Sequence, residues 1–125
     1  MEIINAGFSL EIEEMVTDDK TAKNLGSGLL DVYSTPSMIA LMEKTSMLCV
    51  ERYIDENEST VGGAINIRHM RPTAIGKTVN CSSVVKEIVG KKVEFEVEVY
   101  EGKSMIGTGT HVRFIVDKKS FMSQL

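Results

Sequence analysis

The chain is short of the residues that brace disulfide-rich or proline-rich scaffolds. It holds two cysteines, two prolines and no tryptophan in 125 residues, which excludes a disulfide framework and an extended proline-rich chain. Cys49 and Cys81 fall within expected regular elements and form no CxxC pair. We therefore expect two buried free thiols, because a reactive cysteine needs a partner that lowers its pKa.

The chain also lacks an excess of positive charge and a long apolar run. Its net charge is −4 and its pI is near 5.2, so the chain as a whole would attract neither nucleic acid nor an anionic membrane. No stretch approaches the roughly 18 apolar residues that span a bilayer. Residues 1–14 carry acids instead of the basic start of a targeting segment. We expect a cytoplasmic protein without a membrane or nucleic-acid partner.

The amino-acid composition is otherwise that of an ordinary globular protein. Hydrophobic residues make up 42% and charged residues 26%, with no composition break or internal repeat. This length predicts one domain over residues 1–125, large enough for a core and small enough to favour association of copies.

Residue periodicity predicts five strands and one long helix. The helix is expected from Pro36 to about Ile54 with Thr35 as its N-cap, because a hydroxyl residue before proline suits a helix start. Its polar stripe of Ser37, Lys44 and Glu51 is narrow, so the helix should be nearly surrounded by protein. The strands are expected at residues 8–13, 61–70, 79–89, 92–100 and 105–116.

These elements predict the α+β class, with a five-stranded, largely antiparallel sheet wrapped around the helix. A single helix leaves sheet surface and edges uncovered, which favours a second subunit. The polar segment 17–28 is expected to be a mobile connection able to act as a lid. The tail after Asp117 is expected to fray.

One carboxylate lies on an apolar face of the expected helix. The neighbours of Glu43 around the helix are Ile39, Met47, Val50 and Ile54. An ionised carboxylate in such surroundings costs several kcal/mol unless it is paired or hydrogen-bonded. Glu43 is therefore either a functional carboxylate or an acid at the rim of the buried face that reaches water or a basic partner.

The two histidines fall on different strand faces. His69 shares a face with Ile65 and Ile67, because successive side chains alternate. It is expected to point toward the core or a pocket, as a functional imidazole or as a core histidine bound to a backbone carbonyl. His111 is expected on the solvated side of its strand, opposite the apolar residues Val112, Phe114 and Val116.

Thr35 and the pair Gly62-Gly63 complete the set of candidates. Helix capping explains Thr35, but a helix N-terminus also offers free N–H groups and partial positive charge to an oxyanion. Gly62-Gly63 opens the strand of His69, where a substrate carbonyl could approach backbone N–H groups; a simple bend is the alternative.

A metal or dinucleotide site is not expected. One glutamate and one histidine fall short of the three protein ligands of a catalytic zinc. Gly26-Ser27-Gly28 is not followed by the strand-to-helix fingerprint of a dinucleotide loop. We expect no metal and no separate cofactor.

Three segments and one glycine carry a family resemblance. Residues 31–43 (DVYSTPSMIALME), 60–63 (TVGG) and 67–73 (IRHMRPT), with Gly76, resemble the hotdog-fold thioesterases of the fluoroacetyl-CoA thioesterase-like group. The similarity extends to residues 113–116. The resemblance implies a hotdog fold that dimerises, as a homodimer or a dimer of dimers, with acyl-CoA sites at the subunit interface.

The resemblance also implies roles for the candidate residues. Thr35, Glu43 and His69 would act together to hydrolyse an acyl-CoA thioester to free acid and CoA, with Glu43 as nucleophile or general base. Gly62 or Gly63 would meet the thioester carbonyl. The fluoroacetyl-specific enzyme of the family has phenylalanines in a lid, whereas residues 25–30 hold no aromatic. We expect a short or small acyl group but do not carry over fluoroacetyl specificity.

Two other functions are compatible with the same fold. One is a non-catalytic acyl-CoA-binding or regulatory protein, and the other is a dehydratase of hydroxyacyl thioesters. A pure binder of apolar acyl chains gains nothing from a partly buried Glu43, which favours hydrolysis. Release of CoA thiol distinguishes the hydrolase from both.

Overall fold

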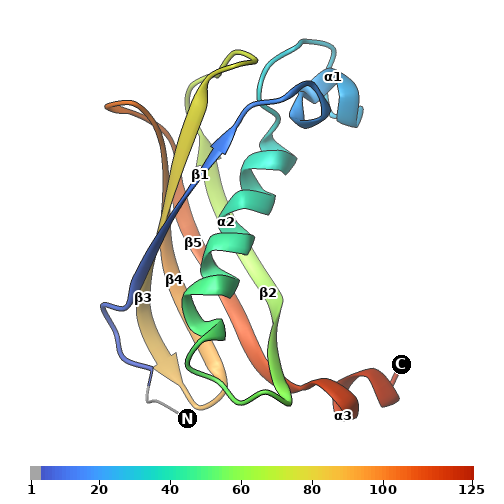
Figure 1. Cartoon of the computed structure of the whole chain (residues 1–125), viewed down its shortest axis with the longest axis vertical. Coiled ribbons are helices and arrows are strands. Elements are labelled where there is room, and N and C mark those ends of the chain that lie inside the picture. The colour runs from blue at the N-terminus through green and yellow to red at the C-terminus, as the bar shows by residue number, and fades with distance from the viewer. Residues whose placement is uncertain (1–3) are drawn as a thin grey trace.

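The structure, a computed structural model, describes residues 4–125, so the first three residues of the expected single domain lie outside the described part. Figure 1 shows one long helix in front of a curved sheet. In chain order the elements are β1 (Ser9–Met15), the 3-10 helix η1 (Asp18–Lys20), α1 (Ala22–Leu25), α2 (Thr35–Glu51), β2 (Glu58–His69), β3 (Thr78–Val89), β4 (Lys92–Glu101), β5 (Ser104–Asp117) and α3 (Lys118–Ser123).

All five strands join one antiparallel sheet. Their order is β1-β3-β4-β5-β2, which leaves β1 and β2 at the edges. The predicted α+β class and five-stranded sheet are confirmed. The Gly90 and Gly102 turns close the hairpins β3–β4 and β4–β5 with positive φ, a conformation that glycine adopts without a Cβ penalty.

The core lies between α2 and the face of the sheet that it covers. Met38, Met42 and Val50 on the helix are fully buried, as are Phe95 and Val97 on β4. A hydrogen bond of 2.7 Å between the hydroxyls of Ser46 and Ser83 joins α2 to β3 inside this core. The helix is therefore fixed to the sheet by apolar packing and one buried polar contact.

The prediction of two buried free thiols is confirmed. Cys49 and Cys81 are both free and fully buried. Burial raises the pKa of the Cys81 thiol to about 11 and also raises the pKa of Cys49. Neither cysteine is available as a thiolate nucleophile near neutral pH.

The start and end of α2 differ from the sequence prediction. Ser34, with extended backbone, is the N-cap, and its hydroxyl accepts a hydrogen bond of 3.1 Å from the Ser37 N–H. The prediction of Thr35 as the cap is wrong, because the helix begins one residue earlier and Thr35 is its first residue. Its hydroxyl is thereby free for another partner. The helix ends at Glu51, before the expected Ile54.

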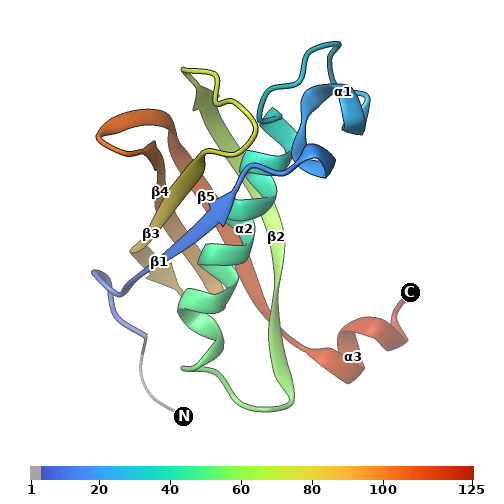
Figure 2. The same cartoon turned by 45° about the horizontal axis from the view of Figure 1, so that its top comes forward.

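The helix is less enclosed than expected. Ala40 and Lys44 are exposed, and a row of residues spaced four apart has one exposed member, Thr35, and three partly buried ones. We call this row the open face of α2; it consists of Thr35, Ile39, Glu43 and Met47. Among residues 4–125, no other helix or strand lies over the side of α2 turned away from the sheet (Figures 1 and 2). The prediction of a nearly surrounded helix is wrong for a single chain.

Two segments expected to lack regular structure are partly helical. Thr21, between η1 and α1, is fully buried and pairs with Tyr33, so it anchors a segment whose other residues are exposed or partly buried. The tail forms α3, because the Asp117 carboxylate caps it by accepting a hydrogen bond of 2.9 Å from the Ser120 N–H. No helix in residues 4–125 is long and apolar enough to cross a membrane.

Candidate active site

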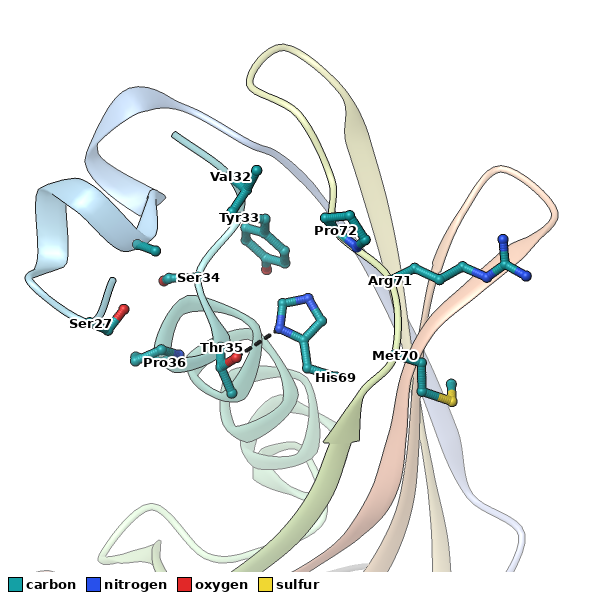
Figure 3. Close-up of a pocket in the computed structure, with 11 residues that line it drawn as sticks. Ser27, Val32, Tyr33, Ser34, Thr35, Pro36, His69, Met70, Arg71 and Pro72 are labelled. Atoms are coloured by element: carbon teal, nitrogen blue, oxygen red, sulfur yellow. Dashed lines mark hydrogen bonds between the residues drawn. The ribbon is translucent and has the colours of Figure 1, made fainter. Parts of the chain in front are cut away.

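Thr35 and His69 meet at the N-terminal end of α2. Figure 3 shows the two side chains pointing toward one another from the helix and from the end of β2. The distance between Thr35 Oγ1 and His69 Nδ1 is 2.8 Å. The hydroxyl can make this contact because Ser34, and not Thr35, caps the helix.

The Thr35–His69 pair borders a surface cavity of about 310 Å³. Val32, Tyr33 and Pro36 form part of its wall beside the pair. Arg71 and Met70 border the same cavity, but their side chains point away from the imidazole in Figure 3. A small molecule in this cavity would therefore meet the threonine hydroxyl and the histidine ring together.

His69 is half-buried, and this burial determines the protonation state of its ring. Burial lowers the pKa of His69, against a smaller opposing effect of the Arg71 backbone. The ring is therefore neutral at pH 7. Its Nε2 is buried and has no hydrogen-bond partner among residues 4–125. A neutral imidazole can accept a proton from a neighbouring group.

Glu43 lies in a second cluster, further along α2. Its side chain is 43% exposed, and Oε2 lies 3.7 Å from Nη1 of Arg113 on β5. The carboxylate is therefore neither buried among apolar groups nor free in solvent. It is an acid at the rim of the covered helix face with a basic partner, which is the alternative that the sequence pattern left open.

Arg113 and its neighbour His111 are functional candidates that sequence reasoning missed. Both face α2 and are buried, with exposures of 7% and 2%. The prediction of a solvated His111 is wrong. Alternation separated the two faces of β5 correctly, but the apolar face of Val112 and Phe114 was assigned to the core. Phe114 is in fact 40% exposed on the outer side of the sheet. Arg113 pairs with Gly62 of the neighbouring strand β2. Because Gly62 was already a candidate, this pairing would have pointed to Arg113 as well.

The two glycines point to different faces, as successive residues of a strand do, and the register of β2 shifts between Gly62 and Ala64. A Cβ on Gly62 would lie 3.0 Å from Glu43 Oε2, whereas a Cβ on Gly63 would overlap the ring of Phe114. Gly62 is thus the glycine beside the carboxylate, and Gly63 belongs to the outer face.

The structure brings the predicted residues together in two groups. Thr35 and His69 form one group, and Glu43 and Gly62 form the other. Thr35 and Glu43 are eight residues apart, about 12 Å along the axis at the usual helical rise. No hydrogen bond or ion pair joins the two groups within residues 4–125. In the same range no three His, Cys, Asp or Glu side chains gather as metal ligands would.

Comparison with known proteins identifies the family. A model of the family described as "Fluoroacetyl-CoA-specific thioesterase" matches residues 16–119. The chain belongs to this family. A curated relative, the fluoroacetyl-CoA thioesterase of Streptantibioticus cattleyicolor, is 27% identical over 95 residues, which cover 76% of this chain and 68% of the relative. The suspected resemblance is confirmed, and the chain is a thioesterase, a hydrolase of acyl-CoA thioesters.

Solved structures of thioesterases have the same fold. A point mutant of the fluoroacetyl-CoA-specific thioesterase in complex with fluoroacetate and CoA superposes with a TM-score of 0.90 at 25% identity, covering 94% of this chain and 99% of that one. A thioesterase-superfamily member from Thermus thermophilus gives a TM-score of 0.91 at 25% identity, covering 99% and 92%. The predicted hotdog fold is confirmed.

Proposed function

We propose that this thioesterase hydrolyses a small acyl-CoA with Thr35, Glu43 and His69 as its reactive groups. The observation that carries the proposal is the hydrogen bond of 2.8 Å between Thr35 and His69 at the edge of the 310 Å³ cavity. A hydroxyl and a neutral imidazole held together beside a cavity can act in acyl transfer.

The chemistry needs a nucleophile, an oxyanion site and a proton for the leaving sulfur. Glu43 either takes a proton from a water that adds to the thioester carbonyl, or attacks the carbonyl itself to form an acyl-glutamyl anhydride that water then hydrolyses. In both routes the C–S bond breaks and the final products are the free acid and CoA. Neutral His69 relays to the leaving sulfur a proton that comes from the attacking water, so the ring is neutral again at the end, and Thr35 hydrogen-bonds the imidazole. The carbonyl oxygen is proposed to lie against backbone N–H groups near Gly62, where no side chain blocks its approach.

A second copy of the chain is proposed to complete each site. Glu43 is about 12 Å from Thr35 along the helix, and both lie on the open face of α2. β2 is an edge strand with unpaired backbone groups, which a second β2 can satisfy. Two-fold pairing along this edge would bring the Thr35–His69 group of one protomer to the Glu43 group of the other.

The acyl group is proposed to be small but not specifically fluoroacetyl. The cavity beside His69 holds about 310 Å³, at the low end of the range for small-molecule sites. The exposed segment 26–31 beside it contains no aromatic residue to close over the acyl group. Cytoplasmic location and independence from a cofactor stay predictions from the sequence.

The proposal is tested by CoA-thiol release from a panel of acyl-CoAs, with wild type and Glu43→Gln assayed together. We expect kcat/KM of Glu43→Gln to fall at least about a hundredfold, the low end for a positioned acid or base, with folding retained. Wild-type kcat/KM in a folded Glu43→Gln protein would remove Glu43 from the mechanism. Formation of enoyl product from 3-hydroxyacyl-CoA without thiol release would select the dehydratase instead.

A further inference from the structure

Tyr33, two residues before Thr35, contacts residues of both edge strands of the sheet. It is buried, with 1% of its surface exposed. Its N–H donates a hydrogen bond of 2.8 Å to the Thr73 carbonyl, and Tyr33 forms an antiparallel bridge with Thr21. The backbone that carries the ring is therefore held by Thr21 ahead of α1 and by the loop that follows β2.

The hydroxyl of Tyr33 is held by a carboxylate on β1. It donates a hydrogen bond of 2.7 Å to Oε2 of Glu14. Glu14 shares the partly buried face of its strand with Leu10 and Ile12, where an acid costs desolvation unless it has a partner. In the part of the chain that the structure describes, no lysine or arginine forms an ion pair with Glu14. The phenol of Tyr33 is thus the side-chain partner of this carboxylate.

The ring of Tyr33 meets the imidazole of His69, as Figure 3 shows. The two centroids are 6.5 Å apart and the planes are at 81°, an edge-to-face geometry that aromatic pairs favour. Thr35 holds the imidazole at Nδ1 through the contact of 2.8 Å. One hydrogen bond fixes a single atom of the imidazole and leaves the ring free to tilt about that atom. The Tyr33 ring supplies the second contact.

The hydrogen bond to Glu14 keeps the same direction near neutral pH. Burial raises the pKa of Tyr33, and the bond to Glu14 raises it further, so the phenol stays protonated and donates. Within residues 4–125, no hydrogen bond or ion pair joins Glu14 to His69. A contact effect of Glu14 on the imidazole therefore passes through the Tyr33 ring.

We propose that Tyr33 is a positioning residue for His69 in thioester hydrolysis, and that Glu14 acts by holding the Tyr33 hydroxyl. Thr35 fixes the imidazole at Nδ1 and the anchored Tyr33 ring fixes its tilt, so His69 keeps one orientation beside the cavity. This assignment rests on the proposed role of His69. A displacement of about 1 Å in a reacting group can cost about a hundredfold in rate, so even a modest loosening of the imidazole is measurable.

The first test removes the Tyr33 hydroxyl and its acceptor in turn, with CoA-thiol release as the assay. Tyr33→Phe keeps the ring but loses the anchor, so we expect kcat to fall about threefold to tenfold with KM changed by less than about twofold. Glu14→Leu should give the same loss, whereas Glu14→Gln keeps an oxygen acceptor and should retain most of the wild-type kcat. Tyr100→Phe is the matched control, because it removes a tyrosine–glutamate hydrogen bond of 3.0 Å, to Glu98, elsewhere on the sheet. It should retain the wild-type kcat.

The ring-nitrogen signals of His69 report whether the imidazole itself responds. Long-range proton–nitrogen NMR spectra, assigned with His69→Ala, separate this ring from His111. We expect the His69 signals to shift or broaden in Glu14→Leu and to stay at their wild-type positions in Glu14→Gln, with His111 unmoved in both.

A merely structural pair would lower the amount of folded protein without changing kcat per folded molecule or the His69 signals. That result in Tyr33→Phe and Glu14→Leu overturns the inference, and if one of the two does not fold, the other decides. Equal losses of kcat in Glu14→Gln and Glu14→Leu also overturn it, because the charge and not the anchored hydroxyl would then be what matters.

A double variant separates this inference from the proposed function. In the His69→Ala background, Tyr33→Phe should cause no further loss of kcat, because a positioning residue has nothing left to position. Independent, additive losses would contradict the coupling. If His69→Ala itself keeps the wild-type rate, the proposed function fails at His69. If His69→Ala is slow while Tyr33→Phe and Glu14→Leu match the wild type in kcat and in the His69 signals, only the role of Tyr33 fails.

Discussion

At the scale of single residues, Gly62 controls how closely the Glu43 carboxylate approaches the backbone of β2. A Cβ at this position would stand 3.0 Å from Oε2, a separation that side chains rarely tolerate. The atom that must move is the end of a half-exposed side chain, so the fold can absorb the change more easily than the reaction can. The neighbouring Gly63 meets the Phe114 ring on the other face, where the overlap strains the sheet instead.

We therefore expect Gly62→Ala to affect mainly kcat and Gly63→Ala to affect mainly the free energy of unfolding. Gly62→Ala should lower kcat by about tenfold or more while the free energy of unfolding changes by less than about 1 kcal/mol. Gly63→Ala should lower the free energy of unfolding by about 1–3 kcal/mol, the usual cost of overpacking. Urea unfolding and CoA-thiol release on both proteins check this, and equal kcat for wild type and Gly62→Ala would refute the close approach.

The two buried histidines also make stability depend on pH. Burial lowers the pKa of both His69 and His111 in the folded protein. Between those lowered values and the unfolded value near 6.5, the unfolded chain binds more protons than the folded one. Their contribution to stability is therefore complete above about pH 6.5 and is lost as the pH falls.

The free energy of unfolding is expected to change with pH by at most about 1.4 kcal/mol per pH unit for each histidine. Urea unfolding at pH 7.5 and pH 5.5 measures it, and His111→Asn, which can keep the hydrogen bond to Ala64, should show a shallower dependence. Glu58 and Asp117, whose pKa values are lowered by hydrogen bonds from the Asp55 and Ser120 backbones, lose their contributions only at more acidic pH. A wild-type protein equally stable at both pH values would contradict the buried, neutral histidines.

At the scale of elements, the N-terminus of α2 places a helix cap and a proposed reactive group on adjacent residues. Ser34 caps the helix, whereas Thr35 bonds His69. The sequence motif Ser-Thr-Pro contains two hydroxyl residues, and local pattern alone could not say which one was the cap. The tertiary partner His69, 34 residues away, is what distinguishes them.

Two alanine substitutions should separate these roles. Ser34→Ala is expected to cost about 1 kcal/mol of stability through the lost cap. Thr35→Ala should cost clearly less stability but lower kcat, because it removes the hydroxyl partner of the imidazole. Thermal unfolding and thiol release on both variants test the division, and a larger stability loss for Thr35→Ala would reassign the cap.

The strands and the long helix were predictable from the sequence because their signals are local. Alternation in β4 and the glycine turns define the hairpins without reference to the rest of the chain. His111 was placed on the wrong side because both faces of β5 carry apolar or buried groups, so alternation gives the period but not which face is inside. Its partners Ala64 and Arg113 become visible only through strand pairing.

At the scale of the whole molecule, a single chain holds the proposed reactive groups in two separate clusters. The open face of α2 and the free edge of β2 lie together on the side of the molecule that carries Thr35, Glu43 and His69. Within residues 4–125 the carboxylate group and the imidazole group are joined by no contact. The candidate residues could be selected from family spacing, but their division into two groups depends on where β2 and β5 pack against α2, which only the structure shows.

Complementation between two inactive variants tests this account most directly. Glu43→Gln and His69→Ala chains, co-expressed with different tags and purified as mixed dimers, are assayed for CoA-thiol release against each variant alone. If each site takes Glu43 from one protomer and His69 from the other, a mixed dimer regains one intact site of two, and a random mixture should recover about a quarter of the wild-type rate. A mixed dimer no more active than its separate variants would contradict a site shared between two copies.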